Sequence, residues 1–231
     1  MKSEIKKVNC NFPAPVVDYR KLSWKKLNSA EYRHLKLLMF WPVFGLLFQY
    51  VERFYPVEEY YAVFHPLDNK IPFFEYFLIP YLFWFLYLVG MHIYTLFYDI
   101  GAFRKMMNFI MLTYLVTILI YFLFPTCQEL RPSAFERDNI FTRIMADYYQ
   151  FDTNTNVCPS LHVIGSLAVM FASFHCKDFK TLGWKLFFIT TAVLISISTV
   201  FLKQHSVLDI VVALPICIIA YFICFCKKEK V

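Results

Sequence analysis

Six long apolar runs constrain the fold of this chain more than any other feature of its sequence. They cover residues 37–51, 77–98, 106–125, 159–176, 186–202 and 206–226 of 231. At about 1.5 Å per helical residue, the last five can each cross most or all of a hydrocarbon core about 30 Å thick. The first run is short and contains Pro42, so it needs residues 32–36 or a tilt to cross. Since no ten-residue alternation indicates an outer-membrane barrel, we predict an all-α polytopic membrane protein, with six transmembrane helices in a bundle.

The composition agrees with a bilayer as the solvent for most of the chain. Hydrophobic residues make up 59% and aromatic residues 20%, and only 17% are charged, against roughly 25% in soluble domains. These values exclude a disordered chain and exceed what one soluble core of this size could bury. The net charge of +6 does not by itself indicate nucleic acid, because the placement of the basic residues decides its meaning. We expect the lipid bilayer, and no nucleic acid, as partner.

The placement of the basic residues predicts the orientation. Lys and Arg number nine in residues 1–36, two in 99–105, three in 177–185 and three in 227–231, but only six on the opposite side. Both termini are therefore predicted to be cytoplasmic, in a plasma or cytoplasmic membrane. The polar first 30 residues predict no signal peptide. We expect residues 1–36 to form a cytoplasmic or interfacial segment, with 18–36 as an interfacial helix or a solvated tail. Residues 37–231 are expected to form one membrane domain.

Asp209 is the only acidic residue inside the six runs, which contain no Lys or Arg. A carboxylate in hydrocarbon costs about 3 kcal/mol and usually has a function and a partner. His205 lies four residues earlier, so on a helix its imidazole can reach the carboxylate. This pairing would set the tautomer of His205 and leave its other nitrogen free as a nucleophile or base. Taken alone the pair is a weak signal, since such spacings often arise by chance.

The predicted topology brings more polar residues to the same membrane face. Six of them are expected at one depth on the non-cytoplasmic side: Arg131, Ser160, His162, Lys203, His205 and Asp209. Such a set suits phosphoryl transfer, because Arg131 and Lys203 offer positive charge to phosphate oxygens. Ser160 lies at a helix start, where free N–H groups favour an anion. We expect His205 to attack phosphorus while His162 protonates the leaving oxygen. The loop 126–158 is long for a compact bundle, and loops of that length tend to be functional or disordered.

The cysteines do not indicate a metal centre. The seven Cys residues are too scattered for a disulfide scaffold, and none belongs to a zinc-ligand cluster. We therefore expect no structural metal. Cys127 and Cys158 bracket the external loop and could pair in an oxidising compartment, but we expect two free thiols.

Three segments resemble the signatures of the type 2 phosphatidate phosphatase superfamily. Pro159-Ser160-Leu161-His162 is similar to P-S-x-H, Ser198 to Asp209 is similar to S-R-x5-H-x3-D, and Arg131-Pro132 resembles the end of K-x6-R-P. The likeness spans roughly residues 77–226. It implies a six-helix enzyme without metal or cofactor, and a phosphohistidine intermediate on His205 that Asp209 orients. It also implies that His162 is the acid and that Arg131 and Ser160 bind phosphate.

Two basic residues of these signatures are missing here. Phe124 stands where the first signature has Lys, and Thr199 stands where the third has Arg. Lys203 or Gln128 would have to substitute for them. The altered third signature resembles the branch that contains sphingomyelin synthases and fungal inositolphosphorylceramide synthases. Those enzymes pass a phospho-head group to a lipid alcohol.

We therefore expect a metal-independent lipid phosphatase that dephosphorylates a membrane lipid phosphate or pyrophosphate at the non-cytoplasmic face. Hydrolysis is slightly favoured, because water needs no dedicated acceptor pocket. The alternatives are transfer of the phospho-head group to a lipid alcohol, and a non-catalytic membrane scaffold. The two histidines and the aspartate argue against the scaffold. The identity of the lipid and the oligomeric state are left open.

Overall fold

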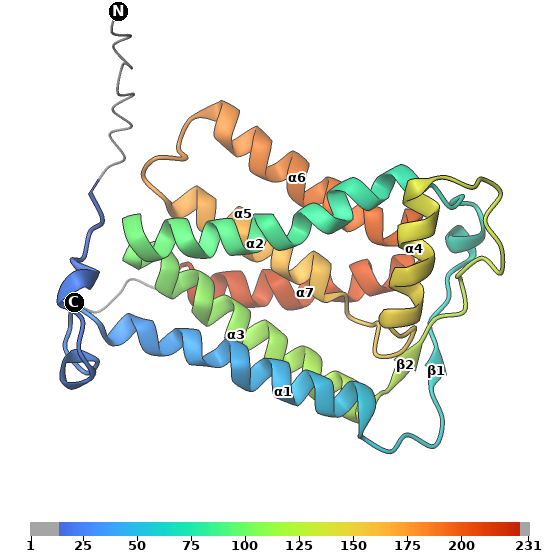
Figure 1. The fold of residues 1–231 in the computed structure, drawn as a ribbon, viewed down its shortest axis with the longest axis horizontal. Coiled ribbons are helices and arrows are strands. Elements are labelled where there is room, and N and C mark those ends of the chain that lie inside the picture. Colours follow the sequence, from blue (N-terminus) through green and yellow to red (C-terminus); the bar gives the residue numbers. More distant parts are fainter. Residues whose placement is uncertain (1–13, 227–231) are drawn as a thin grey trace, which may run out of the picture.

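The computed structural model describes residues 14–226, and helices dominate that part of the chain. The longer elements are η3 (Arg33–Met39), α1 (Phe40–Arg53), α2 (Leu78–Tyr98), α3 (Ile100–Leu123), α4 (Ile140–Phe151), α5 (Leu161–His175), α6 (Leu182–Phe201) and α7 (Val207–Cys224). Two-residue strands β1 (Tyr61–Ala62) and β2 (Thr126–Cys127) pair in parallel. Figure 1 shows α1, α2, α3, α5, α6 and α7 running along the bundle and α4 lying across one end of it. The prediction of an all-α membrane fold is confirmed.

Five of the helical segments in the described part are long and apolar enough to cross a bilayer. The first of them combines η3 with α1 and runs from Arg33 to Arg53, so the short first run does extend at its N-terminal end. Pro42 falls in the first turn of α1, where its missing N–H costs no hydrogen bond. Among the six predicted spans, the one at residues 159–176 forms a shorter helix, α5. It has only 15 residues and is therefore about 22 Å long.

Helix α5 forms the centre of the bundle and contacts α2, α3, α6 and α7. One of its faces is built from small buried residues: Gly165, Ser166, Ala168, Ala172 and Ser173. Small side chains let neighbouring helices approach closely inside a membrane. Because four helices surround it, α5 can begin and end within protein and need not cross the whole hydrocarbon core by itself.

The segment before α1 does not form one regular helix: its two ends pack on the bundle, while residues 20–26 between them are exposed. Residues 18–36 form short 3-10 turns, η1 (Tyr19–Lys21), η2 (Trp24–Lys26) and the start of η3. The Tyr19 hydroxyl contacts the His34 ring at 2.8 Å and donates to the Leu96 carbonyl at 2.7 Å. Tyr32 is fully buried. Tertiary packing against the end of α2 therefore replaces the regular helix that an isolated amphipathic segment would adopt.

The opposite end of the bundle carries the long connections. The predicted loop 126–158 contains α4, which the sequence interpretation did not foresee. The Asn139 side chain caps this helix by accepting from the N–H groups of Phe141 and Thr142. Between α1 and α2 lie β1, η4 (Pro66–Asn69) and η5 (Glu75–Phe77). These connections cover the ends of α5, α6 and α7, where the candidate site lies.

Candidate active site

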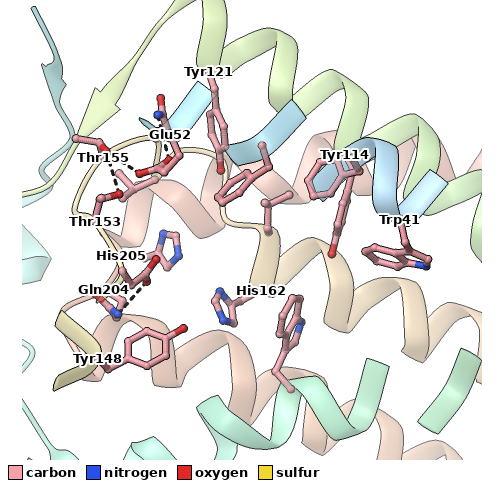
Figure 2. Close-up of a pocket in the computed structure, with 17 residues that line it drawn as sticks. Trp41, Glu52, Tyr114, Tyr121, Tyr148, Thr153, Thr155, His162, Gln204 and His205 are labelled. Atoms are coloured by element: carbon pink, nitrogen blue, oxygen red, sulfur yellow. Dashed lines mark hydrogen bonds between the residues drawn. The ribbon is translucent and has the colours of Figure 1, made fainter. Parts of the chain in front are cut away.

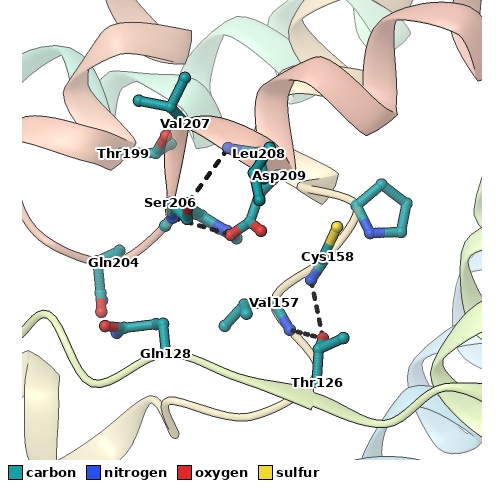
Figure 3. A network of polar contacts seen from close by, with 12 residues as sticks. Thr126, Gln128, Val157, Cys158, Thr199, Gln204, Ser206, Val207, Leu208 and Asp209 are labelled. Atoms are coloured by element: carbon teal, nitrogen blue, oxygen red, sulfur yellow. Dashed lines mark hydrogen bonds and ion pairs between the residues drawn. The ribbon is translucent and has the colours of Figure 1, made fainter. Parts of the chain in front are cut away.

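The His205–Asp209 pair forms as the helical spacing predicts. His205 Nδ1 lies 2.8 Å from Asp209 Oδ2, and the carboxylate is fully buried. Since a carboxylate accepts, Nδ1 must carry the proton, which leaves the lone pair on Nε2. The same Oδ2 accepts from the Ser206 N–H at 3.1 Å, and Ser206 Oγ accepts from the Leu208 N–H at 3.2 Å (Figure 3). This capping box holds the pair at the start of α7.

A second carboxylate supports this turn from outside the helix. Asp68, in η4, is fully buried and accepts from Ser206 Oγ at 2.6 Å and from the Val207 N–H at 2.9 Å. It therefore satisfies donors at the N-terminus of α7, where negative charge is also favoured by the helix dipole. The sequence interpretation missed Asp68, because the residues that it contacts lie 138 and 139 positions further along the chain.

His162 faces His205 from the first turn of α5. The two ring centroids are 6.0 Å apart, so one phosphate group can contact both rings. The His162 ring stacks on Tyr81 at 4.4 Å and packs against Trp84 at 4.5 Å. Its Nε2 is buried and has no hydrogen-bond partner among the described residues. His162 thus has no carboxylate to orient it, unlike His205, and the two imidazoles sit in different surroundings.

The histidines line a cavity of about 230 Å³. Figure 2 shows Glu52, Thr155 and Gln204 at one end, with Trp41 and Tyr114 at the other and the two histidines between. The remaining lining residues are Phe44, Phe48, Trp84, Tyr121, Tyr148, Asp152, Thr153, Asn156, Val157 and Leu161. No lysine or arginine is among them. The cavity therefore brings together imidazole, carboxylate and aromatic groups.

Two carboxylates of the cavity were not foreseen from the sequence. Glu52 lies just beyond the first apolar run, but α1 continues to Arg53 and carries it to the cavity. Its two oxygens accept from Thr155 Oγ1 at 2.8 Å and from Asn156 Nδ2 at 3.2 Å. Asp152 Oδ2 accepts from Gln204 Nε2 at 3.2 Å. Burial raises the pKa of Asp152, while His205 opposes that rise.

Arg131 does not line the cavity, although it was predicted to bind phosphate. Its NH1 donates to the carbonyls of Tyr149 and Asp152, and its NH2 donates to the Thr153 carbonyl and to Gln204 Oε1, at 2.6–3.0 Å. The guanidinium also lies over the Tyr149 ring, 4.6 Å from its centroid. Burial lowers the pKa of Arg131. Arg131 therefore binds the C-terminal end of α4 and orients Gln204, which does line the cavity.

This geometry predicts a structural effect for Arg131→Lys. An ammonium group cannot meet four acceptors in a fixed fork, so buried carbonyls lose their donors. We expect the variant to lose about 2 kcal/mol or more of stability, measured as a lower thermal midpoint in detergent. Arg143→Lys is the matched control, because Arg143 lies on α4 in an exposed pair with Asp138. Equal midpoints for the two variants would show that the Arg131 contacts carry no such energy.

Lys203 and Gln128, two further predicted phosphate ligands, contact loop residues outside the cavity. Lys203 Nζ donates to the Asp68 and Ile71 carbonyls at 2.7 and 2.5 Å, and burial lowers its pKa. Its φ of 53° belongs to the left-handed turn that ends α6 and directs the side chain toward η4. Gln128 is fully buried, and its Oε1 accepts from the Leu130 N–H. Lys203 and Gln128 therefore hold loops in place, and neither of them lines the cavity.

Ser160 is the N-cap of α5, as its position after Pro159 suggested. Its side chain makes no capping hydrogen bond, and Oγ is buried without a partner among residues 14–226. Its backbone N–H donates to the Asp209 carbonyl at 3.2 Å. The first N–H groups of α5 therefore have no side-chain acceptor, and the helix start beside His162 can accommodate an anion.

Cys127 and Cys158 form no disulfide in this structure. Thr126 Oγ1 accepts from the N–H groups of Val157 and Cys158, both at 3.1 Å (Figure 3). Burial and the neighbouring Asp209 carboxylate raise the pKa of the Cys158 thiol to about 12, so it stays protonated. No group of three or more His, Cys, Asp or Glu side chains within the described residues forms a set of metal ligands.

The family relationship agrees with this geometry. Residues 105–231 match the family model of the PAP2 superfamily. This chain belongs to the PAP2 superfamily. Members of the superfamily are generally phosphatases or phosphotransferases, and the apolar helices make this member an integral membrane protein. The chain matches no curated protein and no solved structure.

The boundary of the family match divides the cavity between two parts of the chain. The matched part of this superfamily member contains His162, His205 and Asp209. Glu52, on α1, and Trp84, on α2, lie outside the match but line the same cavity. The groups suited to phosphoryl transfer therefore belong to the family region, while part of the surrounding wall comes from helices α1 and α2, outside the match.

Proposed function

We propose that this protein transfers the phosphoryl group of a membrane lipid phosphate ester through a phosphohistidine on His205. The observation that supports this most directly is the buried His205–Asp209 pair, which faces His162 across one cavity. In this proposal His205 is the nucleophile and His162 is the acid. Asp209 is the positioning residue.

The reaction proceeds in two balanced steps. His205 Nε2 attacks phosphorus and forms a P–N bond, while the P–O bond to the leaving group breaks and its electron pair stays on oxygen. His162 donates a proton to that oxygen, and an alcohol departs. An acceptor hydroxyl then attacks phosphorus and gives its proton to His162. The P–N bond breaks, its electron pair returns to Nε2, and the enzyme is restored.

The developing charges have nearby partners. Asp209 stabilises the positive charge that the imidazole of His205 acquires as it bonds to phosphorus. The N-terminus of α5, with the unpartnered Ser160 hydroxyl, supplies N–H groups for the phosphate oxygens. These groups take over part of the role that lysine and arginine have in the superfamily signatures. Lys203 and Gln128, which were expected to do so, are engaged with loop carbonyls and a backbone N–H.

The acceptor in the second step is water in a phosphatase and a lipid alcohol in a phosphotransferase. Hydrolysis remains the simpler proposal. Transfer is the second candidate, and the aromatic inner half of the cavity favours it, since Trp41, Phe44 and Phe48 can hold an apolar acceptor.

Product analysis tests both forms of the proposal. Purified protein is given phosphatidate and phospholipids that carry labelled phosphate, with and without a lipid alcohol, a diacylglycerol whose acyl chains differ in mass from those of the donor lipids. Free labelled phosphate or phospho-head group supports hydrolysis, and a newly labelled lipid that requires diacylglycerol supports transfer. If neither product forms from any of these lipids, the proposed function is wrong.

A further inference from the structure

The cavity has a charge pattern that does not suit a simple phosphate monoester. Two carboxylates, Glu52 and Asp152, line it together with two imidazoles, and no ammonium or guanidinium group does so. Arg131 and Lys203 lie close by, but protein oxygens occupy their donors. A doubly charged phosphate would therefore approach two negative side chains without the cations that normally compensate it.

Glu52 in particular has only neutral hydrogen-bond donors around its carboxylate. It is half-buried near the end of a membrane-spanning helix. Its hydrogen-bond donors, Thr155 and Asn156, are both neutral, and no salt bridge to it occurs within residues 14–226. Carboxylates in such positions are usually paired with a cation or serve a function. The position is therefore suited to a cation that arrives with the ligand.

The aromatic side chains around the carboxylates strengthen the case for a cation. Phe48 lies one helical turn before Glu52 on the same face of α1, and both line the cavity. Tyr121 and Tyr148 line the same cavity as Glu52 (Figure 2). An ammonium group gains from the faces of such rings as well as from a carboxylate.

The inner half of the cavity offers places for the rest of a lipid. Trp41, Phe44, Phe48 and Glu52 share one face of α1, a length of about 16 Å. Tyr114 is 1% exposed, and its hydroxyl group and Trp84 Nε1 are buried without hydrogen-bond partners in the described part of the chain. Both would lie 2.9 Å from a Cβ placed on Gly165, so the two donors point to the same spot. Oxygens of a lipid backbone would satisfy them.

On these observations we propose that the substrate is a zwitterionic phospholipid, a phosphodiester whose ammonium head group binds Glu52 and the aromatic rings around it. The proposal rests on the proposed function and specifies its substrate class. The net charge of such a head group is close to zero, which suits a cavity that is lined by carboxylates but by no lysine or arginine. The phosphodiester lies between His162 and His205, so that His205 Nε2 bonds to phosphorus, the P–O bond to the glycerol oxygen breaks, and His162 protonates that oxygen as diacylglycerol leaves. The lipid backbone extends toward Trp84 and Tyr114.

The test compares lipids that share their acyl chains and differ in the head group. Purified protein in mixed micelles is given phosphatidylcholine, phosphatidylethanolamine, phosphatidylglycerol or phosphatidate, each with labelled phosphate. The rate that is lost in His205→Ala defines specific turnover. We expect kcat/KM to be at least tenfold higher for the two ammonium lipids than for the other two. We expect Glu52→Gln to lower the ratio of phosphatidylcholine to phosphatidylglycerol turnover at least tenfold.

Two further variants separate charge recognition from structure. Glu59→Gln removes an exposed carboxylate from the same end of the bundle, and the head-group ratio should not change. Thr155→Val removes a hydrogen bond to Glu52 without changing its charge, so its ratio should stay closer to that of the wild type than the ratio of Glu52→Gln does. If Thr155→Val lowers the ratio as much as Glu52→Gln does, Glu52 only anchors the loop and the proposal is wrong.

The remaining outcomes separate this proposal from the proposed function. If phosphatidate or phosphatidylglycerol turns over in a His205-dependent way without an ammonium preference, the function stands and the substrate class is wrong. If no lipid shows His205-dependent turnover, both proposals fail. Dodecylphosphocholine should inhibit at least tenfold more strongly than water-soluble phosphocholine. Equal inhibition would contradict a lipid-linked head group.

Discussion

His205→Ala is expected to lower phosphoryl transfer by at least about 10⁴-fold, because the variant loses the nitrogen that bonds to phosphorus. The opposing imidazole of His162 cannot take over, since it has no carboxylate partner and packs between Tyr81 and Trp84. The measurement is turnover of labelled lipid phosphate, together with trapping of acid-labile, alkali-stable phosphohistidine after a rapid quench. Both signals should disappear.

Controls for this variant must show that the bundle still folds. Removing the imidazole leaves Asp209 buried without its strongest partner, which costs stability. His205→Gln retains a donor toward Asp209 and is therefore the second variant, also expected to be inactive. His175→Ala is the matched control, because His175 lies at the other end of α5, and its Nδ1 contacts the Phe171 carbonyl at 2.9 Å. Near-normal turnover in either His205 variant would remove this residue as the nucleophile.

Asp209→Asn is expected to lower the rate less, by about 100-fold. One carboxylate oxygen, Oδ2, accepts from both His205 Nδ1 and the Ser206 N–H. An asparagine oxygen in the same place can keep both hydrogen bonds, so the nucleophile and its tautomer survive. The negative charge that stabilises the imidazole during attack is lost. The rate of phosphohistidine formation should therefore fall, while the thermal midpoint changes little.

The matched control for this variant is Asp99→Asn. Asp99 also caps a helix, since its Oδ1 accepts from the Ala102 N–H at 3.0 Å, but it lies at the opposite end of the bundle. We expect normal turnover in this control. If Asp209→Asn leaves the rate of phosphohistidine formation at the wild-type value, the assignment of Asp209 as the positioning residue is wrong.

The division of the cavity suggests how one reaction is directed to a particular substrate. The family region supplies the two histidines and the aspartate. His205 and Asp209 are four residues apart, and His162 lies in the first turn of a helix. Helices α1 and α2, outside the match, supply Glu52 and Trp84. Replacing wall residues on these helices can alter the head group that is accepted without moving the reacting imidazoles.

Local periodicity made much of the fold predictable. Apolar runs of helical length locate the membrane helices, because a chain in lipid must satisfy its own backbone hydrogen bonds. The spacing of His205 and Asp209 predicted their contact for the same reason, since residues four apart share a helix face. Helix α4 was predictable in principle from Asn139 before an amphipathic segment, but the loop that contains it is polar overall and was read as irregular.

Contacts between distant segments could not be obtained in this way. Lys203 was expected to face the phosphate, yet the left-handed turn at its backbone directs its side chain to the Asp68 carbonyl, 135 residues earlier. Arg131 was also expected to bind phosphate, yet its guanidinium donates to carbonyl groups at the end of α4. Which oxygens surround a cation depends on how loops pack, and residue type and local spacing carry no information about that.

The amino-acid sequence alone was sufficient for the membrane fold and for the His205–Asp209 pair, because both follow from interactions within single helices. Tertiary structure decided which groups surround the pair. Glu52 and Asp152 line the cavity, whereas Arg131 and Lys203 lie outside it, and Asp68 lies at the start of α7. The physical reason is that burial and charge compensation are properties of the packed bundle, to which residues more than 100 positions apart contribute together.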